Sequence, residues 1–121
     1  MKRSQQTGKF AERRAAHFLE SHGLRIIASN YTCRRGEIDI IALDGTTMIF
    51  VEVKFRSRSN WGAPADHVTF KKKQRLVSAA REFLSQPLTP PYQQIRFDVI
   101  ACQRTIRWIQ RAFTLDDLII D

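Results

Sequence analysis

Residues 36–55 read GEIDIIALDGTTMIFVEVKF, and this stretch determines the predicted fold. Two runs rich in isoleucine, valine and phenylalanine, 37–43 and 46–55, flank Asp44-Gly45. Alternating apolar runs joined by Asp-Gly are a strong short-range signal for a β-hairpin. The sequence therefore predicts two antiparallel strands with a two-residue turn at Asp44 and Gly45.

Charged residues interrupt both strands of this hairpin. A turn at residues 44 and 45 pairs Glu37 with Glu52 and Asp39 with Phe50 across the strands. Because strand side chains alternate, Asp39, Glu52 and Lys54 are expected on one face, with Asp39 and Glu52 as diagonal neighbours. Like charges within apolar strands are costly unless paired, and a divalent cation is a natural partner. The alternative is a solvated outer face on which Lys54 offsets Glu52.

Helices and further strands are predicted on both sides of the hairpin. Apolar residues at helical spacing predict helices over 7–22 and 66–85. Short apolar runs predict strands over 24–28, 95–102 and 105–110. The segment 56–65 is expected to be a loop. The order αβββαββ predicts one α/β domain over residues 1–121, with a mixed sheet flanked by helices.

Composition narrows the classes of protein that the chain can belong to. Of its 121 residues 43% are hydrophobic, which suits one folded domain. No apolar run approaches the roughly 20 residues that span a bilayer, and the N-terminus lacks the apolar stretch of a secretory signal. Cys33 and Cys102 stand far apart without a CxxC pair, so neither a disulfide framework nor a zinc site is expected. We expect a cytoplasmic protein.

The charge balance indicates a polyanionic partner. Twenty lysines and arginines against twelve acidic residues give a formal net charge of +8. Nucleic acids bind such proteins because each neutralised phosphate releases condensed counterions. Anionic membrane surfaces also attract basic proteins, so charge alone leaves the partner open.

Two charged residues border the apolar stripes of the predicted helices. The first helix carries its apolar residues at Phe10, Ala11, Ala15, Phe18 and Leu19. Glu12 lies on or beside this stripe, either as part of a site or as a boundary glutamate paired with a nearby arginine. Lys72 lies four residues before Leu76 and eight before Ala80, within a run of three lysines. It is expected to contact phosphate or to lie on a solvated surface.

The chain resembles the bacterial YraN family, a group of predicted endonucleases similar to archaeal Holliday-junction resolvases within the PD-(D/E)xK nuclease superfamily. The match comprises Asp39 and the Glu52-Val53-Lys54 element, with Ile38 where the formal motif has proline. Further matching segments are Gly8 to Glu12, Asn30-Tyr31, Arg35 to Ile41, Phe50 to Lys54, Lys72 to Leu76 and Arg96 to Val99. The resemblance covers nearly the whole chain and implies a restriction-endonuclease-like αβββαβ core.

The resemblance also implies a reaction and its residues. Asp39 and Glu52 would be ligands of Mg²⁺ or Mn²⁺, Lys54 would position or polarise the attacking water, and Glu12 would be a helix-borne acidic member of the catalytic site. The implied activity is metal-dependent DNA endonucleolysis, and the resemblance suggests branched or junction DNA as the substrate. Related resolvases dimerise, so the resemblance also suggests a homodimer.

Basic residues that flank the hairpin are candidates for DNA binding. Arg34 and Arg35 precede the first strand, and Arg56 and Arg58 follow the second. With Lys72 they are expected to reach phosphates and so to recognise backbone or shape rather than base sequence. One alternative is a non-catalytic nucleic-acid-binding module with the same fold. Another is a basic protein that docks on an acidic protein partner.

Overall fold

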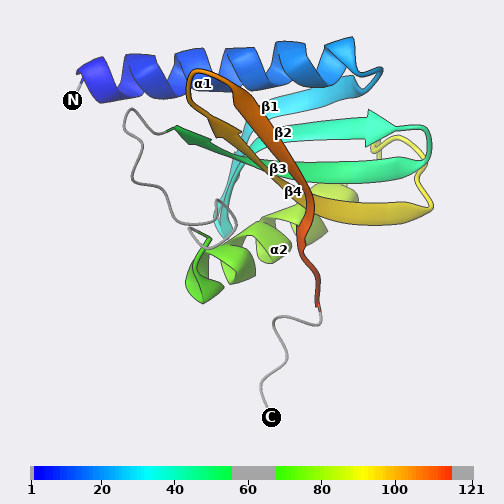
Figure 1. Ribbon diagram of the computed structural model, residues 1–121. Coiled ribbons are helices and arrows are strands. Elements are labelled where there is room, and N and C mark those ends of the chain that lie inside the picture. Colours follow the sequence, from blue (N-terminus) through cyan, green and yellow to red (C-terminus); the bar gives the residue numbers. More distant parts are fainter. Residues whose placement is uncertain (1, 56–67, 116–121) are drawn as a thin grey trace.

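The computed structural model describes residues 2–55 and 68–115, and the predicted order of elements, αβββαββ, is confirmed (Figure 1). Helix bounds are Lys2–Ser21 for α1 and Phe70–Leu84 for α2. Strand bounds are Arg25–Cys33 for β1, Gly36–Asp44 for β2, Thr47–Phe55 for β3, Gln94–Cys102 for β4 and Ile106–Phe113 for β5. The predicted loop 56–65 lies outside the described residues.

The five strands form one mixed sheet in the order β1-β2-β3-β4-β5. Strands β3 and β4 are parallel, and the other neighbouring pairs are antiparallel. Helix α2 lies in the connection between the two parallel strands, as such a crossover requires. Helix α1 covers one face of the sheet and α2 the other (Figure 1). This confirms the predicted α/β class.

Each face of the sheet buries its own apolar core. Met48 and Phe50 of β3 pack with Leu76 and Phe83 in the core beneath α2. The intervening residues of β3, Ile49 and Val51, pack with α1 through a second core. Because β3 is central and covered on both faces, it reads as a continuous apolar run. Glu52 is the residue that ends this run.

The hairpin register differs from the predicted one. Ile41 lies opposite Phe50, and Asp44 lies opposite Thr47, so the two-residue turn is Gly45-Thr46 rather than Asp44-Gly45. Gly45 has φ +61°, as expected at the first central position of a type II′ turn. The predicted facing pairs Glu37–Glu52 and Asp39–Phe50 are therefore wrong.

Strands β2 and β3 separate beyond the last backbone pair, Ile40–Val51. Beyond that point β2 continues to pair with β1 up to Gly36, whereas β3 continues to pair with β4 up to Phe55. We call this divergence the strand fork. Strict alternation also fails here, because Ile38 joins the α2 core while Ile40 joins the α1 core. Asp39 and Glu52 are the first residues beyond the last pair, so the fork brings both carboxylates to one opening.

Asp98, a buried carboxylate like Glu52, joins strands β4 and β5 through hydrogen bonds. Asp98 of β4 is 1% exposed and accepts two hydrogen bonds of 2.9 Å from the Arg96 guanidinium. Trp108 Nε1 donates to Asp98 at 2.9 Å, and the backbone N–H of Arg111 donates at 3.0 Å. Arg111 has φ +54° where the β4–β5 register shifts, so Asp98 satisfies a backbone N–H at this irregularity. The segment 96–99 of the resemblance thus has a structural role.

The helical stripe prediction was wrong at one position. Ala11, Ala15 and Leu19 are buried against the sheet, but Phe10 is 54% exposed. Phe10 lies one residue before the buried Ala11, and so it is rotated about 100° away from the face that meets the sheet. Within residues 2–55 and 68–115, no helix is long and apolar enough to cross a membrane.

Candidate functional site

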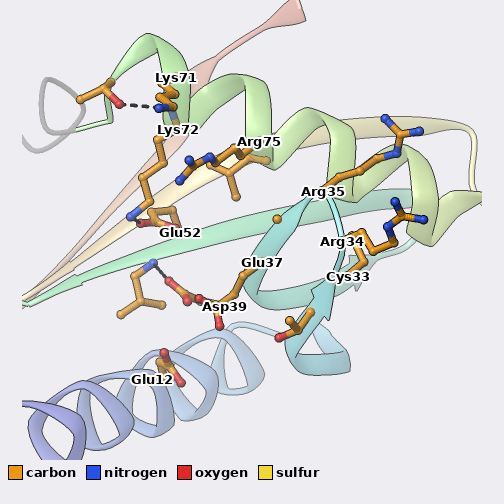
Figure 2. Close-up of a pocket in the computed structure, with 15 residues that line it drawn as sticks. Glu12, Cys33, Arg34, Arg35, Glu37, Asp39, Glu52, Lys71, Lys72 and Arg75 are labelled. Carbon is orange, nitrogen blue, oxygen red and sulfur yellow. Dashed lines mark hydrogen bonds and ion pairs between the residues drawn. The ribbon is translucent and has the colours of Figure 1, made fainter.

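The strand fork opens into a pocket of about 790 Å³. Asp39 reaches it from β2 and Glu52 from β3, while α1 contributes Glu12 and α2 contributes Lys72 (Figure 2). Figure 2 shows Asp39 between Glu12 and Glu52, with Lys72 above Glu52. Residues that are distant in the sequence thus bring the carboxylates of Glu12, Asp39 and Glu52 to a single opening, which Glu37 also lines.

A backbone hydrogen bond positions Asp39. The N–H of Val53 donates to Asp39 Oδ2 at 2.8 Å. Because this N–H belongs to β3 beyond the last backbone pair, the Asp39 side chain takes the place of a strand partner. The separation of the strands leaves the Val53 N–H without a backbone partner on β2, and Asp39 supplies the acceptor. This hydrogen bond holds Asp39 beside Glu52.

Glu52 binds two ammonium groups. Its side chain is only 5% exposed, and its Oε2 lies 3.6 Å from Lys54 Nζ and in a closer ion pair with Lys72 Nζ. Burial lowers the pKa of Lys72, but the hydrogen bond and the charge of Glu52 outweigh this effect, so that the pKa is raised. Lys72 was expected to contact phosphate or to lie on a solvated surface; in the structure its ammonium group forms an ion pair with Glu52.

The start of α2 is fixed beside these groups. Thr69 is the N-cap, and its hydroxyl oxygen accepts a hydrogen bond of 3.1 Å from the backbone N–H of Lys72. Such a cap satisfies one of the unpaired N–H groups of a helix N-terminus. The cap therefore fixes the first turn of α2, from which the Lys72 side chain extends to Glu52.

Burial and like charge change the protonation of Asp39. Desolvation is the largest cause and the charge of Glu52 the next, and together they raise the pKa of Asp39 to about 8. The hydrogen bond from Val53 and the charge of Lys72 oppose this shift. At neutral pH Asp39 therefore retains its proton, because burial and the neighbouring Glu52 both disfavour its charged form.

Stability of the metal-free protein should fall between about pH 4 and pH 8. Over this range the folded state keeps the Asp39 proton that the unfolded chain has lost, and so unfolding becomes easier as the pH rises. Thermal melts in chelator at pH 5 to 8.5 should show a falling Tm in wild type and a flatter profile in Asp39→Asn. If Tm fell with pH equally in wild type and Asp39→Asn, the raised pKa would not belong to Asp39.

Glu12 belongs to the same cluster. Burial is the largest cause of its raised pKa, and the charges of Glu37 and Glu52 act in the same direction. Side-chain hydrogen bonds with Asn30 and Asp39 oppose the shift. Glu12 is therefore a member of the carboxylate cluster rather than a boundary glutamate that pairs with an arginine. Asn30, at φ +54° on β1, was not identified as a site residue from the sequence.

Basic residues surround the pocket on the side opposite α1. Arg34 and Arg35, predicted to bind DNA, line it from the β1–β2 turn (Figure 2). Lys71 and Arg75 line it from α2 and were not predicted. Their spacing along one helix face, at four residues, could have identified them once Lys72 was assigned to the site. The other two predicted DNA-binding residues, Arg56 and Arg58, lie outside the described residues.

The donor set fits a hard divalent cation that keeps several waters. Among residues 2–55 and 68–115, no three His, Cys, Asp or Glu side chains are arranged as a ready metal cage. Mg²⁺ does not require such a cage, because it is commonly held by one or two carboxylates together with water and substrate phosphate. Asp39 and Glu52 supply two carboxylates at one opening.

Comparison with known proteins identifies the family. The chain is 42% identical over 111 residues to a UPF0102 protein of Pseudomonas fluorescens, an alignment that covers 89% of this chain and 92% of that protein. A UPF0102 protein of Pseudomonas syringae pv. syringae is 43% identical over 115 residues, covering 90% and 94%. One from Legionella pneumophila is 38% identical over 113 residues, covering 91% and 96%.

The family profile gives the same result. The model described as "Uncharacterised protein family UPF0102" matches residues 11–102. This range begins just before Glu12 and includes Asp39, Glu52, Lys54 and the whole of α2. The chain therefore belongs to the UPF0102 family, which is the YraN family that its sequence motifs resemble.

Proposed function

We propose that the protein is a metal-dependent endonuclease that hydrolyses phosphodiester bonds of DNA. The observation that carries this proposal is the convergence of Asp39 and Glu52 at the strand fork, beside two lysines and within a pocket rimmed by arginines. Carboxylates that hold a cation, together with basic groups that hold phosphate, are the parts that such hydrolysis requires.

Asp39 and Glu52 would hold Mg²⁺ or Mn²⁺ in this site. A divalent cation there would lower the pKa of a bound water and neutralise charge on the phosphoryl oxygens. Asp39 must lose its proton to act as a ligand, so loading of the site should improve as the pH approaches about 8. Glu12, next to Asp39, adds a third carboxylate that can accept a hydrogen bond from a bound water.

Two ammonium groups serve the phosphate and the attacking water. Lys54 is mostly buried beside Glu52, with a side chain 14% exposed, and so it can orient a water and stabilise developing charge. Lys72 is more exposed, at 44%, and extends from α2 toward the same carboxylate. A cation held by Glu52 would leave the Lys72 ammonium available to bind phosphate.

A nuclease assay tests the proposed activity. Wild-type protein should cut at least one of linear, flapped and four-way DNA with Mg²⁺ or Mn²⁺, and chelator should remove the product. Cleavage of RNA of matched sequence, measured in parallel, tests whether the protein is selective for DNA. Absence of chelator-sensitive product from every substrate would contradict the proposal.

A second candidate function is a nucleic-acid-binding module without catalysis. The ion pairs of Glu52 with two lysines favour it, because they balance the charge of that carboxylate without a metal. This reading predicts DNA binding that is equally tight in Mg²⁺ and in chelator, with no product under either condition.

A further inference from the structure

A second hollow continues from the pocket toward the C-terminal end of α2. Adjoining cavities of about 390 and 360 Å³ share Arg34 and Arg35 with the lining of the pocket at the fork. We call this hollow the α2 groove. It is lined by Arg34, Arg35, Ser78, Arg81, Glu82 and Ser85.

Close packing explains why the β1–β2 turn forms one wall of this groove. A side chain at Gly36 would place its Cβ 2.9 Å from the carbonyl oxygen of Arg75, and so only glycine allows the turn to approach the helix this closely. The approach brings Arg34 and Arg35 beside the exposed face of α2. The groove is thus built into the fold, since it needs no rearrangement of either element.

One face of α2 presents a polar stripe to this groove. Residues at helical spacing along it line either the pocket or the groove; they are Lys71, Arg75, Ser78, Glu82 and Ser85, with Arg81 adjacent. The opposite face is buried in the core through Leu76, Ala80 and Phe83. The stripe therefore extends without interruption from the fork to the last turn of the helix.

Positive charge in the groove lacks acidic partners within the described part of the chain. Among residues 2–55 and 68–115 the acidic members of ion pairs are Glu20, Glu52 and Asp98, and none of these pairs includes Arg34, Arg35 or Arg81. Glu82 is the single carboxylate among the lining residues of the groove. Arginine guanidinium groups and serine hydroxyls that converge in a hollow suit phosphate oxygens, which accept several hydrogen bonds.

We propose that the α2 groove binds the phosphodiester backbone of the nucleic acid as it leaves the cleavage site, toward the C-terminal end of α2. This inference rests on the proposed function for the location of the cleavage site. The groove residues Ser78 and Ser85 lie seven residues apart, or about 10 Å along the helix axis. At about 3.4 Å per base pair, the groove spans roughly three base pairs on one side of the cut.

Charge reversal at the distant end of the groove tests this proposal. We would measure the binding of fluorescein-labelled 30-base-pair DNA by anisotropy in chelator, at several salt concentrations. Arg81→Glu should weaken binding about tenfold and flatten the dependence of log K on log salt by about 0.9, the value for one lost phosphate contact. Arg81→Lys should retain most of the affinity.

Arg107→Glu is the matched control, because Arg107 is exposed on β5 and the charge change is the same. It should change the affinity less than twofold. Equal weakening by Arg81→Glu and Arg107→Glu would overturn the proposal, since net charge alone would then explain binding. Poly-glutamate of matched charge that binds wild type as tightly as DNA would overturn the choice of nucleic acid.

Failure of the groove and failure of the nuclease proposal are distinguishable. Binding in chelator requires no cleavage, so a selective effect of Arg81→Glu supports the groove even when no DNA is cut. If Arg81→Glu bound DNA as tightly as wild type while cleavage remained sensitive to chelator, DNA binding by the α2 groove would be contradicted. The proposed nuclease activity would stand. Far-UV circular dichroism of each variant establishes that it is folded.

Discussion

Asp39→Asn should reduce DNA cleavage on the order of 10³-fold or more, while DNA affinity in chelator changes little. Asparagine preserves the shape of the side chain and its acceptor for the Val53 N–H, but it removes the carboxylate that the proposed function assigns to the metal. Asp39 lies between Glu12 and Glu52, apart from Arg34 and Arg35 (Figure 2), so the effect on DNA binding should be small. Initial rates with Mg²⁺ at pH 8 provide the measurement.

Glu37→Gln is the control for this variant. Glu37 lines the same pocket and is exposed, so the substitution makes the same charge change without touching the fork. It should retain cleavage within a few-fold of wild type. If Asp39→Asn cut DNA as fast as Glu37→Gln, Asp39 would have no part in the reaction.

Asp98→Ala should lower the free energy of unfolding by about 3–5 kcal/mol, the range for removal of one partner from a buried ion pair. It leaves Arg96, Trp108 Nε1 and the backbone N–H of Arg111 without their acceptor. Since small domains are stable by about 5–15 kcal/mol, a large share of the stability would be lost. Urea unfolding followed by circular dichroism measures the change.

Exposed Glu20 offers a comparison for Asp98. Its ion pair with His17 is at the surface, at 3.9 Å, and Glu20→Ala should change stability by less than about 1 kcal/mol. If Asp98→Ala lowered the free energy of unfolding no more than Glu20→Ala does, the hydrogen bonds of Asp98 would not stabilise the sheet.

The order of elements could be predicted because apolar periodicity is strong in this chain. Both helices and all five strands were predicted, but several bounds changed, since the end of an element depends on contacts that periodicity does not encode. Strand β1 extends to Cys33 rather than Ala28 because its polar half still pairs with β2. The sequence placed the hairpin turn one residue too early.

The sequence predicted that Asp39 and Glu52 lie near one another, but it did not predict the geometry that brings them together. A regular hairpin would place Asp39 and Glu52 within a continuous ladder, whereas the structure separates the strands at Ile40–Val51. Nothing local in the sequence encodes the fork, because it depends on Asp39 accepting the N–H of Val53 and on pairing with different outer strands. The contact of Lys72 with Glu52 depends likewise on where α2 crosses the sheet.

The proposed function depends above all on the joint binding of one divalent cation by Asp39 and Glu52 at the fork. Calorimetric titration with Mn²⁺ at pH 8 tests it without requiring any substrate. Wild type and Glu37→Gln should each bind one ion with similar affinity, while Asp39→Asn and Glu52→Gln bind at least tenfold more weakly. Equal Mn²⁺ affinity in wild type and Asp39→Asn would contradict this joint binding.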